Sequence, residues 1–523
     1  MSPVETASTI PQLLAAAARQ YGDAPAIEDA AWRVSYRELD ALRRQAARAL
    51  LALDVAHGER VAIWAPNIWE WIVAATALHS VGAALVPLNT RMKGSEAAFV
   101  LRESGASVLF VIGEFLGVDY PALLDDEELP ALRQRIALRG TAPGCLSWEA
   151  FIARAAEVAP TAQAAREAAV HGECMSDLLF TSGTTGKPKG VMTRHAQNLQ
   201  VVRDWSAVVG LQPGDRYLIV NPFFHSFGYK AGWLAALMRG CTLLPQQVFD
   251  VQAVLACVAR ERINVLPGPP TLYQSLLADP QRGAFDLSSL RVAVTGAAAI
   301  PVEMIGRMRD ELGFSTIVTA YGLTESCGFV TICRPGDAPQ LVASTSGRAM
   351  PGVEVRCVDG AGQPVPAGQA GEIVVRGYNL MQGYFNDPQA TAETIDADGW
   401  LHTGDIGVLD ADGYLRITDR LKDMFITGGF NVYPAEIEQS LLDYPGVAQA
   451  AVIGIPDERL GEVAMAFLLP APGRVLDSAS VISWCREHMA NYKVPRRVQL
   501  LEAMPLNAAG KVTKNVLREW VTR

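Results

Sequence analysis

Apolar and polar positions alternate regularly along the first part of the chain. Five successive segments read as strand, helix, strand, helix and strand, at residues 61–64, 68–81, 84–88, 95–103 and 107–112. Further strand-then-helix units follow at 263–277 and 291–312. Because parallel strands are joined by crossover connections that usually contain a helix, this order predicts parallel sheets covered by helices. The predicted fold class is therefore α/β.

The pattern changes after about residue 347. Short β-like runs, such as 371–377 and 414–418, are broken there by Gly, Pro and Asp. Beyond residue 419, one apolar run and two helical stretches predict a compact α/β or α+β unit. These segments are 450–455, 478–489 and the stretch after Thr513.

The length of the chain predicts more than one domain. A chain of 523 residues is too long for a single hydrophobic core. We predict a large N-terminal domain over residues 1–419, built from parallel-sheet subdomains, and a small α+β domain over residues 420–523.

Composition and charge narrow the class of protein. Half of the residues are hydrophobic and 19% are charged, which is typical of a soluble globular enzyme. The net charge of -10 argues against a nucleic-acid partner, because such binding usually relies on basic patches. The eight cysteines show no metal-binding spacing, and no segment reaches the roughly 20 apolar residues of a membrane span. We expect free thiols and a cytoplasmic protein with no integral membrane association.

The segment 176–190 has the composition of a phosphate-binding loop. A β-like run leads into a stretch dense in hydroxyl groups, glycines and lysines. Glycines let backbone amides approach a polyphosphate, hydroxyls donate hydrogen bonds, and lysines supply positive charge. The competing interpretation, a P-loop ATPase, fails on spacing. The positions that would hold its first glycine and its Ser or Thr are occupied by Thr181 and Pro188.

Five later motifs accompany this loop in a fixed order. They are YGLTE at 321–325, GEIVVRG at 371–377, WLHTGD at 400–405, DRLKD at 419–423 and PLNAAGK at 505–511. Together with residues 181–190, they resemble the adenylate-forming superfamily of acyl-CoA synthetases, nonribosomal-peptide adenylation domains and firefly-type luciferases. The resemblance spans about Pro11 to the C-terminus. It implies a small C-terminal domain that is mobile about a hinge near Lys422.

The resemblance assigns many motif residues to nucleotide and coenzyme binding. Tyr321 would pack on adenine, Thr324 would contact phosphate, and Asp405 would bind the ribose hydroxyls with help from Arg420. The residues implied to bind ATP or coenzyme A are Thr181, Ser182, Gly183, Thr184, Thr185, Gly186, Lys187, Lys189, Gly296, Ala297, Ala298, Ala320, Tyr321, Gly322, Thr324, Asp405, Arg420, Lys422, Gly428 and Gly429.

The implied reaction needs no protein nucleophile. The carboxylate of the substrate attacks the α-phosphorus of ATP and pyrophosphate leaves, so alignment and cations suffice. Glu325 is the implied Mg²⁺ ligand, and Lys511 would bridge the attacking carboxylate and the α-phosphate. Thr184 and His225 are further catalytic candidates. In a second step the thiol of coenzyme A attacks the acyl-adenylate, with the 428–429 glycine pair lining its channel.

A largely apolar pocket with one cation is implied for the acid. Its residues would be His225, Tyr229, Lys230, Gly232, Trp233, Thr319, Gly322 and Leu323. His225 lies in a segment rich in aromatic residues. A lone histidine there is often a hydrogen-bonded core residue, but the resemblance favours a role in the acid tunnel.

The sequence favours some members of the superfamily over others. Only twelve residues follow Lys511, so we expect a free-standing ligase that uses soluble coenzyme A rather than a peptide-synthetase module. An acyl-AMP ligase that loads a carrier protein is the alternative. The segments 221–232 and 264–276 look like fatty-acid-type CoA ligases of bacterial steroid degradation, which act on a bicyclic propanoate. A medium- or long-chain fatty acid is equally compatible with an apolar pocket, and a homodimer is compatible with the sequence.

Overall fold

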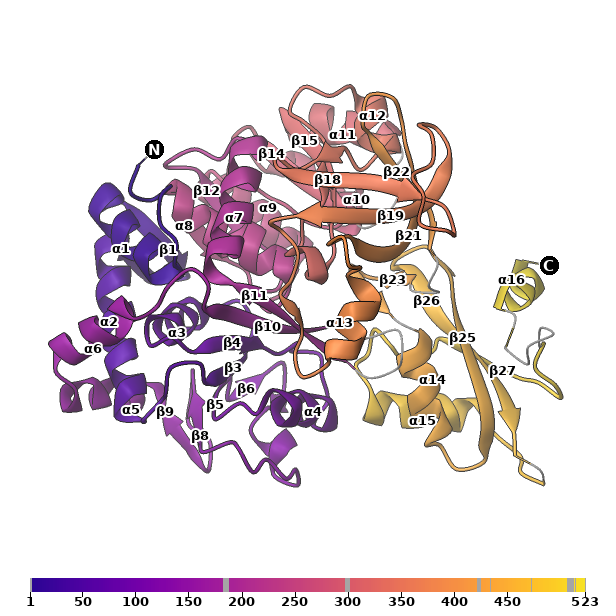
Figure 1. Ribbon diagram of the computed structural model, residues 1–523, viewed down its shortest axis with the longest axis horizontal. Helices are drawn as coiled ribbons and strands as arrows, with labels where there is room; N and C mark the ends of the chain where they lie inside the picture. The colour runs from indigo at the N-terminus through magenta and orange to yellow at the C-terminus, as the bar shows by residue number, and fades with distance from the viewer. Residues whose placement is uncertain are drawn as a thin grey trace.

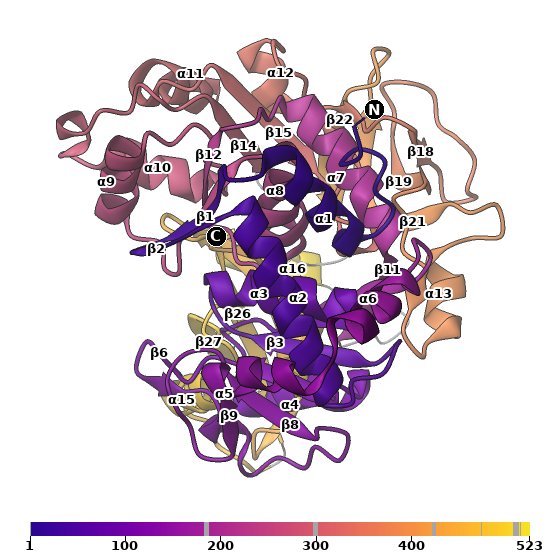
Figure 2. The same cartoon turned by 90° about the vertical axis from the view of Figure 1, so that its left-hand side faces the viewer.

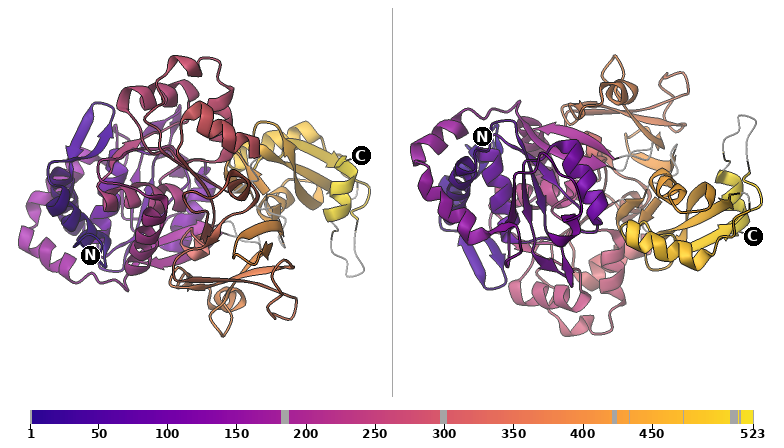
Figure 3. Two further views of the ribbon diagram at one scale, coloured as in Figure 1. Left: turned by 90° about the horizontal axis from the view of Figure 1, so that it is seen from above. Right: turned by 90° about the horizontal axis from the view of Figure 1, so that it is seen from below.

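The computed structural model describes residues 2–181, 188–296, 302–420, 425–432, 434–471, 473–505, 512 and 514–522. A large N-terminal domain and a small C-terminal domain lie side by side (Figures 1 and 3). Each domain combines helices with β-sheets, as the sequence predicted.

The central sheet of the large domain has eight strands and is mostly parallel. In spatial order they are β20 (Gly383–Tyr384), β11 (Lys189–Arg194), β10 (Met175–Thr181), β4 (Ala84–Pro87), β3 (Arg60–Trp64), β5 (Val108–Val111), β8 (Gln134–Ala137) and β9 (Cys145–Ser147). The strands from β10 to β9 pair in parallel, whereas β11 and β20 are antiparallel additions. With α3 (Trp69–Ser80) and α4 (Gly94–Ser104), this sheet confirms the predicted strand–helix alternation.

Helix α3 lies between two sheets. Every residue from Glu70 to Ser80 is buried, because the helix is apolar on nearly all sides. It contacts β3 and β4 on one side and β1 (Pro25–Asp29) on the other. Helices α1 (Ile10–Tyr21) and α2 (Tyr36–Ala52) pack beside it (Figure 2).

A second layer consists of two four-stranded groups. One group is β12 (Arg216–Ile219), β13 (Thr242–Pro245), β1 and β2 (Trp32–Ser35), and the other is β14 (Val292–Gly296), β15 (Thr316–Tyr321), β16 (Thr331–Ile332) and β17 (Arg348–Ala349). Val265 joins them through single parallel bridges to Tyr217 and Val292. The expected strand near residue 263 is therefore one bridge residue, because the prolines that follow cannot donate ladder hydrogen bonds.

The remaining helices of the large domain connect and cover these sheets. They are α5 (Trp148–Ala153), α6 (Pro160–Ala168), α7 (His195–Val209), α8 (Ala235–Arg239), α9 (Val251–Glu261), α10 (Pro270–Ala278), α11 (Val302–Leu312), α12 (Pro339–Ser344) and α13 (Pro388–Thr394). An antiparallel sheet completes the domain with β18 (Val353–Val358), β19 (Ala370–Gly377), β21 (Leu401–Leu409) and β22 (Leu415–Arg420).

The small domain is built on one sheet with a core on each face. Its strands are β24 (Phe430–Val432), β23 (Phe425–Thr427), β26 (Gly461–Pro470), β25 (Val447–Asp457) and β27 (Arg497–Leu500). Alternate residues of β25 and β26 point to opposite faces. One face packs against α14 (Pro434–Leu442) and α15 (Ser478–His488), and the other packs against α16 (Lys514–Thr522).

The hydrophobic cores of the two domains are separate in the part of the chain that the structure describes. The main cluster of the large domain runs from Val4 to Leu415, and those of the small domain begin at Phe425. The boundary at 419/420 stays a prediction. All eight cysteines carry free thiols, and within the described ranges no helix combines the length and apolarity needed to cross a membrane.

Two buried histidines make the stability of the large domain sensitive to acid. His79 and His195 are fully buried with their rings 5.2 Å apart, and His79 Nε2 lies 2.9 Å from the carbonyl oxygen of Ser176. Burial lowers the pKa of His79 from 6.5 to about 4. Between these values the unfolded chain binds a proton that the folded chain does not, so stability falls as the pH falls.

We expect the melting temperature to drop between pH 6.5 and pH 5, with His79 contributing about 2 kcal/mol of lost stability. His79→Gln keeps a donor near the Nε2 position but cannot titrate, so its melting temperature should depend less on pH. Calorimetry of both proteins across this range checks the effect. An equally steep pH dependence in the variant would contradict this role of His79.

Candidate active site

A cavity of about 1210 Å³ lies where the two domains meet. It contains the carboxyl ends of β10, β14 and β15, which is the edge where open α/β sheets usually bind ligands. The structure brings fourteen predicted site residues to its wall: Thr181, Lys189, His225, Gly296, Thr319, Ala320, Tyr321, Gly322, Leu323, Thr324, Glu325, Asp405, Gly428 and Gly429.

Other predicted residues lie elsewhere or outside the described ranges. Tyr229, Lys230, Gly232 and Trp233 do not line this cavity. The residues outside the described ranges are Ser182, Gly183, Thr184, Thr185, Gly186, Lys187, Ala297, Ala298, Lys422 and Lys511. The backbone of Arg420 pairs with that of Asp405, and its side chain is outside the described part.

Tyr321 and Asp405 form one polar corner of the cavity. Tyr321 ends β15, Asp405 lies on β21, and the Tyr321 hydroxyl donates a hydrogen bond of 2.6 Å to Asp405 Oδ2. The pair places an aromatic ring beside a carboxylate that can accept hydrogen bonds from a sugar diol. Gly322 follows at once, and a Cβ atom there would lie 2.1 Å from the carbonyl oxygen of Gly328. Only glycine fits this close backbone approach.

Glu325 places a carboxylate on the same wall of the cavity. It lies in the short 3₁₀ turn Thr324–Ser326, and Tyr384 donates a hydrogen bond of 2.9 Å to its Oε1. The Lys189 ammonium lies 5.0 Å from the centre of the Tyr384 ring, which links the glutamate to the start of β11. A cation and a carboxylate are therefore held near one another.

The residues present fit a magnesium ion that enters with a nucleotide. Within the described ranges, no three His, Cys, Asp or Glu side chains gather into a metal-binding group. Mg²⁺ commonly binds one or two protein carboxylates and completes its shell with waters and substrate phosphates. Glu325 is placed to supply one such carboxylate.

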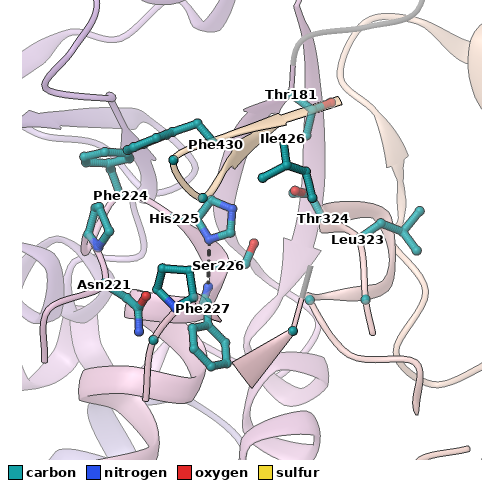
Figure 4. A pocket seen from close by; sticks show the side chains of 18 of the residues that line it. Thr181, Asn221, Phe224, His225, Ser226, Phe227, Leu323, Thr324, Ile426 and Phe430 are labelled. Atoms are coloured by element: carbon teal, nitrogen blue, oxygen red, sulfur yellow. Dashed lines mark hydrogen bonds between the residues drawn. The ribbon is translucent and has the colours of Figure 1, made fainter. Parts of the chain in front are cut away.

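His225 faces the cavity with a defined tautomer. Its side chain is exposed to the cavity, and its Nδ1 accepts a hydrogen bond of 3.3 Å from the backbone N–H of Phe227 (Figure 4). Desolvation by the surrounding walls of the cavity lowers the pKa of His225, which favours the neutral imidazole. Nδ1 accepts in this arrangement, so Nε2 carries the proton and can donate to a ligand.

Lys230, predicted as the cation of the acid pocket, does not line this cavity. It lies on the π-helix η3 (Phe227–Leu234), is fully buried, and pairs with buried Asp177 at 3.4 Å. Thr193 donates a hydrogen bond of 2.6 Å to the same carboxylate oxygen. The sequence predicts one continuous wall over residues 229–233, whereas a helical path turns successive side chains toward different sides. Gly232 likewise packs near Ile219 and not on the cavity wall.

The small domain supplies the outer wall through the β23–β24 hairpin. Ile426, Gly428, Gly429 and Phe430 line the cavity, and in the view of Figure 4 His225 lies between this hairpin and Phe227. Gly429 has a φ of +84°, and a Cβ atom there would lie 3.5 Å from the Pro269 side chain of the large domain. The hairpin therefore fits closely against the large domain.

Several wall residues were not found from the sequence. Arg91 places its guanidinium 4.5 Å from the centre of the Phe430 ring, across the domain boundary. Phe224, Phe227 and Phe329 add an aromatic surface. Phe224 and Phe227 lie in the same aromatic segment as His225. That segment could therefore have indicated both residues from the sequence alone. No local pattern marks Arg91, because its contact forms only when the domains meet.

The chain is similar to known protein families and individual enzymes over most of its length. It matches the family model of the AMP-binding enzyme over residues 14–385 and that of the AMP-binding enzyme C-terminal domain over residues 436–511. It is 49% identical over 521 residues to the 3-[(3aS,4S,7aS)-7a-methyl-1,5-dioxo-octahydro-1H-inden-4-yl]propanoyl:CoA ligase of Rhodococcus jostii, covering 98% of this chain and 99% of the relative. The ligase of the same name from Mycobacterium tuberculosis is 53% identical over 511 residues, covering 98% of each.

Solved structures agree with this assignment. The amide bond synthetase McbA from Marinactinospora thermotolerans has a TM-score of 0.85 and 29% identity, covering 98% of this chain and 99% of that one. A Mycobacterium tuberculosis fatty acyl CoA synthetase has a TM-score of 0.71 and 31% identity, covering 98% of each chain. The family matches, the relatives and the cavity together lead to one conclusion: the chain belongs to the AMP-binding enzyme family.

Proposed function

We propose that this protein is an acyl-CoA synthetase. It activates a carboxylic acid with ATP, releases pyrophosphate, and transfers the acyl group from acyl-AMP to coenzyme A. The observation that carries the proposal is the convergence of motif residues from both domains on one cavity. Lys189, Glu325 and Asp405 come from the large domain, and Gly428 and Gly429 come from the small domain.

In the first step, each described residue has a role that suits its chemical group. Tyr321 and Asp405 hold adenosine, the tyrosine against the base and the carboxylate on the ribose hydroxyls. Lys189 offsets phosphate charge, and Glu325 would hold Mg²⁺, which when bound screens the phosphates and stabilises the leaving pyrophosphate. The His225 Nε2–H orients the carboxylate of the acid by donating a hydrogen bond. The donors and acceptors that line the cavity support these proposed roles.

We further propose that the acid is a propanoate that carries a bicyclic ketone. Two relatives that share about half of their residues with this chain are named as ligases of such an acid. The aromatic side chains of Phe224, Phe227 and Phe329 suit a rigid alicyclic body. The cavity volume of about 1210 Å³ leaves room for a nucleotide and a bulky acid together.

The decisive experiment measures both products across a panel of acids. The purified protein is incubated with ATP, Mg²⁺ and coenzyme A, and with the bicyclic dioxo-propanoate, linear fatty acids or aromatic acids. We expect pyrophosphate release and stoichiometric consumption of coenzyme A, with the bicyclic acid giving the highest kcat/KM. Pyrophosphate release without loss of coenzyme A would favour carrier loading, and a fatty acid as the best substrate would overturn the substrate proposal.

Glu325→Gln should raise the Mg²⁺ concentration needed for half-maximal pyrophosphate release. A neutral amide is a poorer ligand for a hard cation than a carboxylate, so we expect a shift of roughly tenfold or more. The amide still accepts the hydrogen bond from Tyr384, and the melting temperature should change little. Mg²⁺ titrations of pyrophosphate release check the effect, and an unchanged midpoint would exclude a metal-binding role.

A further inference from the structure

A buried cluster of three charges joins the two domains away from the cavity. The Lys493 ammonium lies 2.8 Å from Glu96 Oε1 and 2.5 Å from Glu436 Oε1. Glu96 is in the first turn of α4 in the large domain, whereas Glu436 and Lys493 belong to the small domain. The Lys493 side chain is only 6% exposed. We call Glu96, Glu436 and Lys493 the interdomain latch.

The latch is connected to the cavity by a short row of contacts. Tyr492 stacks on Phe430 with ring centres 4.7 Å apart, and Asn89 Nδ2 donates a hydrogen bond of 3.3 Å to the Tyr492 hydroxyl. Phe430 in turn lines the cavity and receives Arg91 from the large domain. A movement that takes residues 426–430 out of the cavity would therefore also pull Lys493 away from Glu96.

The latch distributes charge unequally between the domains. The small domain carries its own ion pair, Glu436 with Lys493, so the ammonium keeps a partner when the domains separate. Docking adds the second carboxylate, from Glu96, in a setting where water is largely excluded and a charge-assisted hydrogen bond is strong. Glu96 also accepts a hydrogen bond of 2.9 Å from the backbone N–H of Lys93, which fixes its side chain before docking.

Burial makes each carboxylate dependent on the shared ammonium. Desolvation raises the pKa of Glu436, and the coulombic attraction of Lys493 opposes this effect. The same two carboxylates help to raise the pKa of Lys493 well above its usual value, so the ammonium stays charged. Removing the ammonium would leave two partly buried carboxylates close together without their cation, which costs more than the bond itself.

We propose that Lys493 is a positioning residue for the thioester-forming step, and that its bond to Glu96 selects the pose in which the β23–β24 hairpin lines the cavity. The proposal rests on the proposed two-step function. In that function the 428–429 glycine pair serves coenzyme A, while Lys511 serves adenylation from another pose. Losing the bond should therefore slow the second step and spare the first.

The test measures the two half-reactions separately in four variants. Glu96→Gln removes the charge but can still accept the hydrogen bond from Lys93 N, and Glu103→Gln is the control, an exposed position on the same helix. We expect Glu96→Gln to form thioester from supplied acyl-adenylate and coenzyme A roughly tenfold more slowly, a size typical of one charge-assisted bond. Pyrophosphate release without coenzyme A should stay within about twofold of the unaltered protein.

Variants with reversed charges distinguish the electrostatic role of the interdomain latch from a general loss of structure. Glu96→Lys should impair thioester formation more than Glu96→Gln, because it places two ammonium groups together. The triple variant Glu96→Lys, Glu436→Lys and Lys493→Glu reverses every charge, so that one carboxylate lies between two ammonium groups, and it should recover most of the rate. No recovery in the triple variant, together with equal loss of both half-reactions in Glu96→Gln, would overturn the proposal.

Hydrogen–deuterium exchange shows whether the small domain is docked on the large domain, and this measurement does not require catalysis. In Glu96→Gln, we expect faster amide exchange in residues 425–432 and 488–494 and unchanged exchange in the central sheet. If the unaltered protein forms no thioester with any acid, the proposed function fails and this comparison alone decides the latch. Unchanged exchange in Glu96→Gln would then show that Glu96 does not hold the docked pose.

Discussion

Lys511→Ala should lower acyl-adenylate formation by roughly 10²-fold or more, because it removes a cation that acts on the transition state. The same variant should still convert supplied acyl-adenylate and coenzyme A to thioester. Lys511 is outside the described residues, but the neighbouring Val512 and α16 pack on the face of the small-domain sheet opposite α14 and α15. Figure 1 shows α16 at the end of the molecule farthest from the large domain.

Separate assays of the two half-reactions check this expectation. Pyrophosphate release in the absence of coenzyme A reports the first step, and thioester from synthetic acyl-adenylate reports the second. Lys514→Ala is a useful control, since it removes a nearby lysine that pairs with Glu438 within the small domain. Equal impairment of both steps by Lys511→Ala would contradict a mechanism with two alternating poses.

Gly429→Trp should produce the opposite pattern, with adenylation kept and thioester formation reduced by roughly 10²-fold, as expected when reacting groups are displaced by about 1 Å. Gly429 has a φ of +84°, and a Cβ atom there already lies 3.5 Å from Pro269. An indole at this position cannot fit between the hairpin and the large domain. The hairpin would be pushed out of the cavity, and the path for the thiol would be obstructed.

Gly473→Trp is the matched control for the strain of a positive φ. Gly473 is also in the small domain, has a φ of +74°, and a Cβ atom there meets nothing within 4 Å. Both half-reactions should survive in this variant, with a similar loss of melting temperature from backbone strain. If Gly429→Trp forms thioester at the normal rate, the hairpin does not form the wall of the thiol path.

Much of the architecture could be predicted because local periodicity decides it. The alternation over residues 61–112 appears as β3, α3, β4, α4 and β5, with each end shifted by at most one residue, within the usual uncertainty of element boundaries. The strand β26, by contrast, was not predicted. Its pairing with β25 is a long-range contact, and its apolar run alone does not distinguish a strand from a buried helix.

The candidate site was predicted where a motif places consecutive residues on a strand end or a tight turn. Residues 319–325 all line the cavity, since β15 ends there and the chain turns along the wall. The segment 229–233 does not, because the π-helix sends Lys230 to Asp177 instead. Contacts between the domains, such as Lys493 with Glu96, have no local signature and follow only from docking.

The separation of the two hydrophobic cores affects how a reactive intermediate is handled. A mixed anhydride of a carboxylic acid and AMP hydrolyses if it is released into water, so an enzyme that carries it between distant sites would lose product. In the proposed two-step mechanism, separate cores would let the small domain turn as a preformed unit while the large domain retains the anhydride, without exposing the core of either. The catalytic groups would then move to the intermediate, which would stay bound between the two steps.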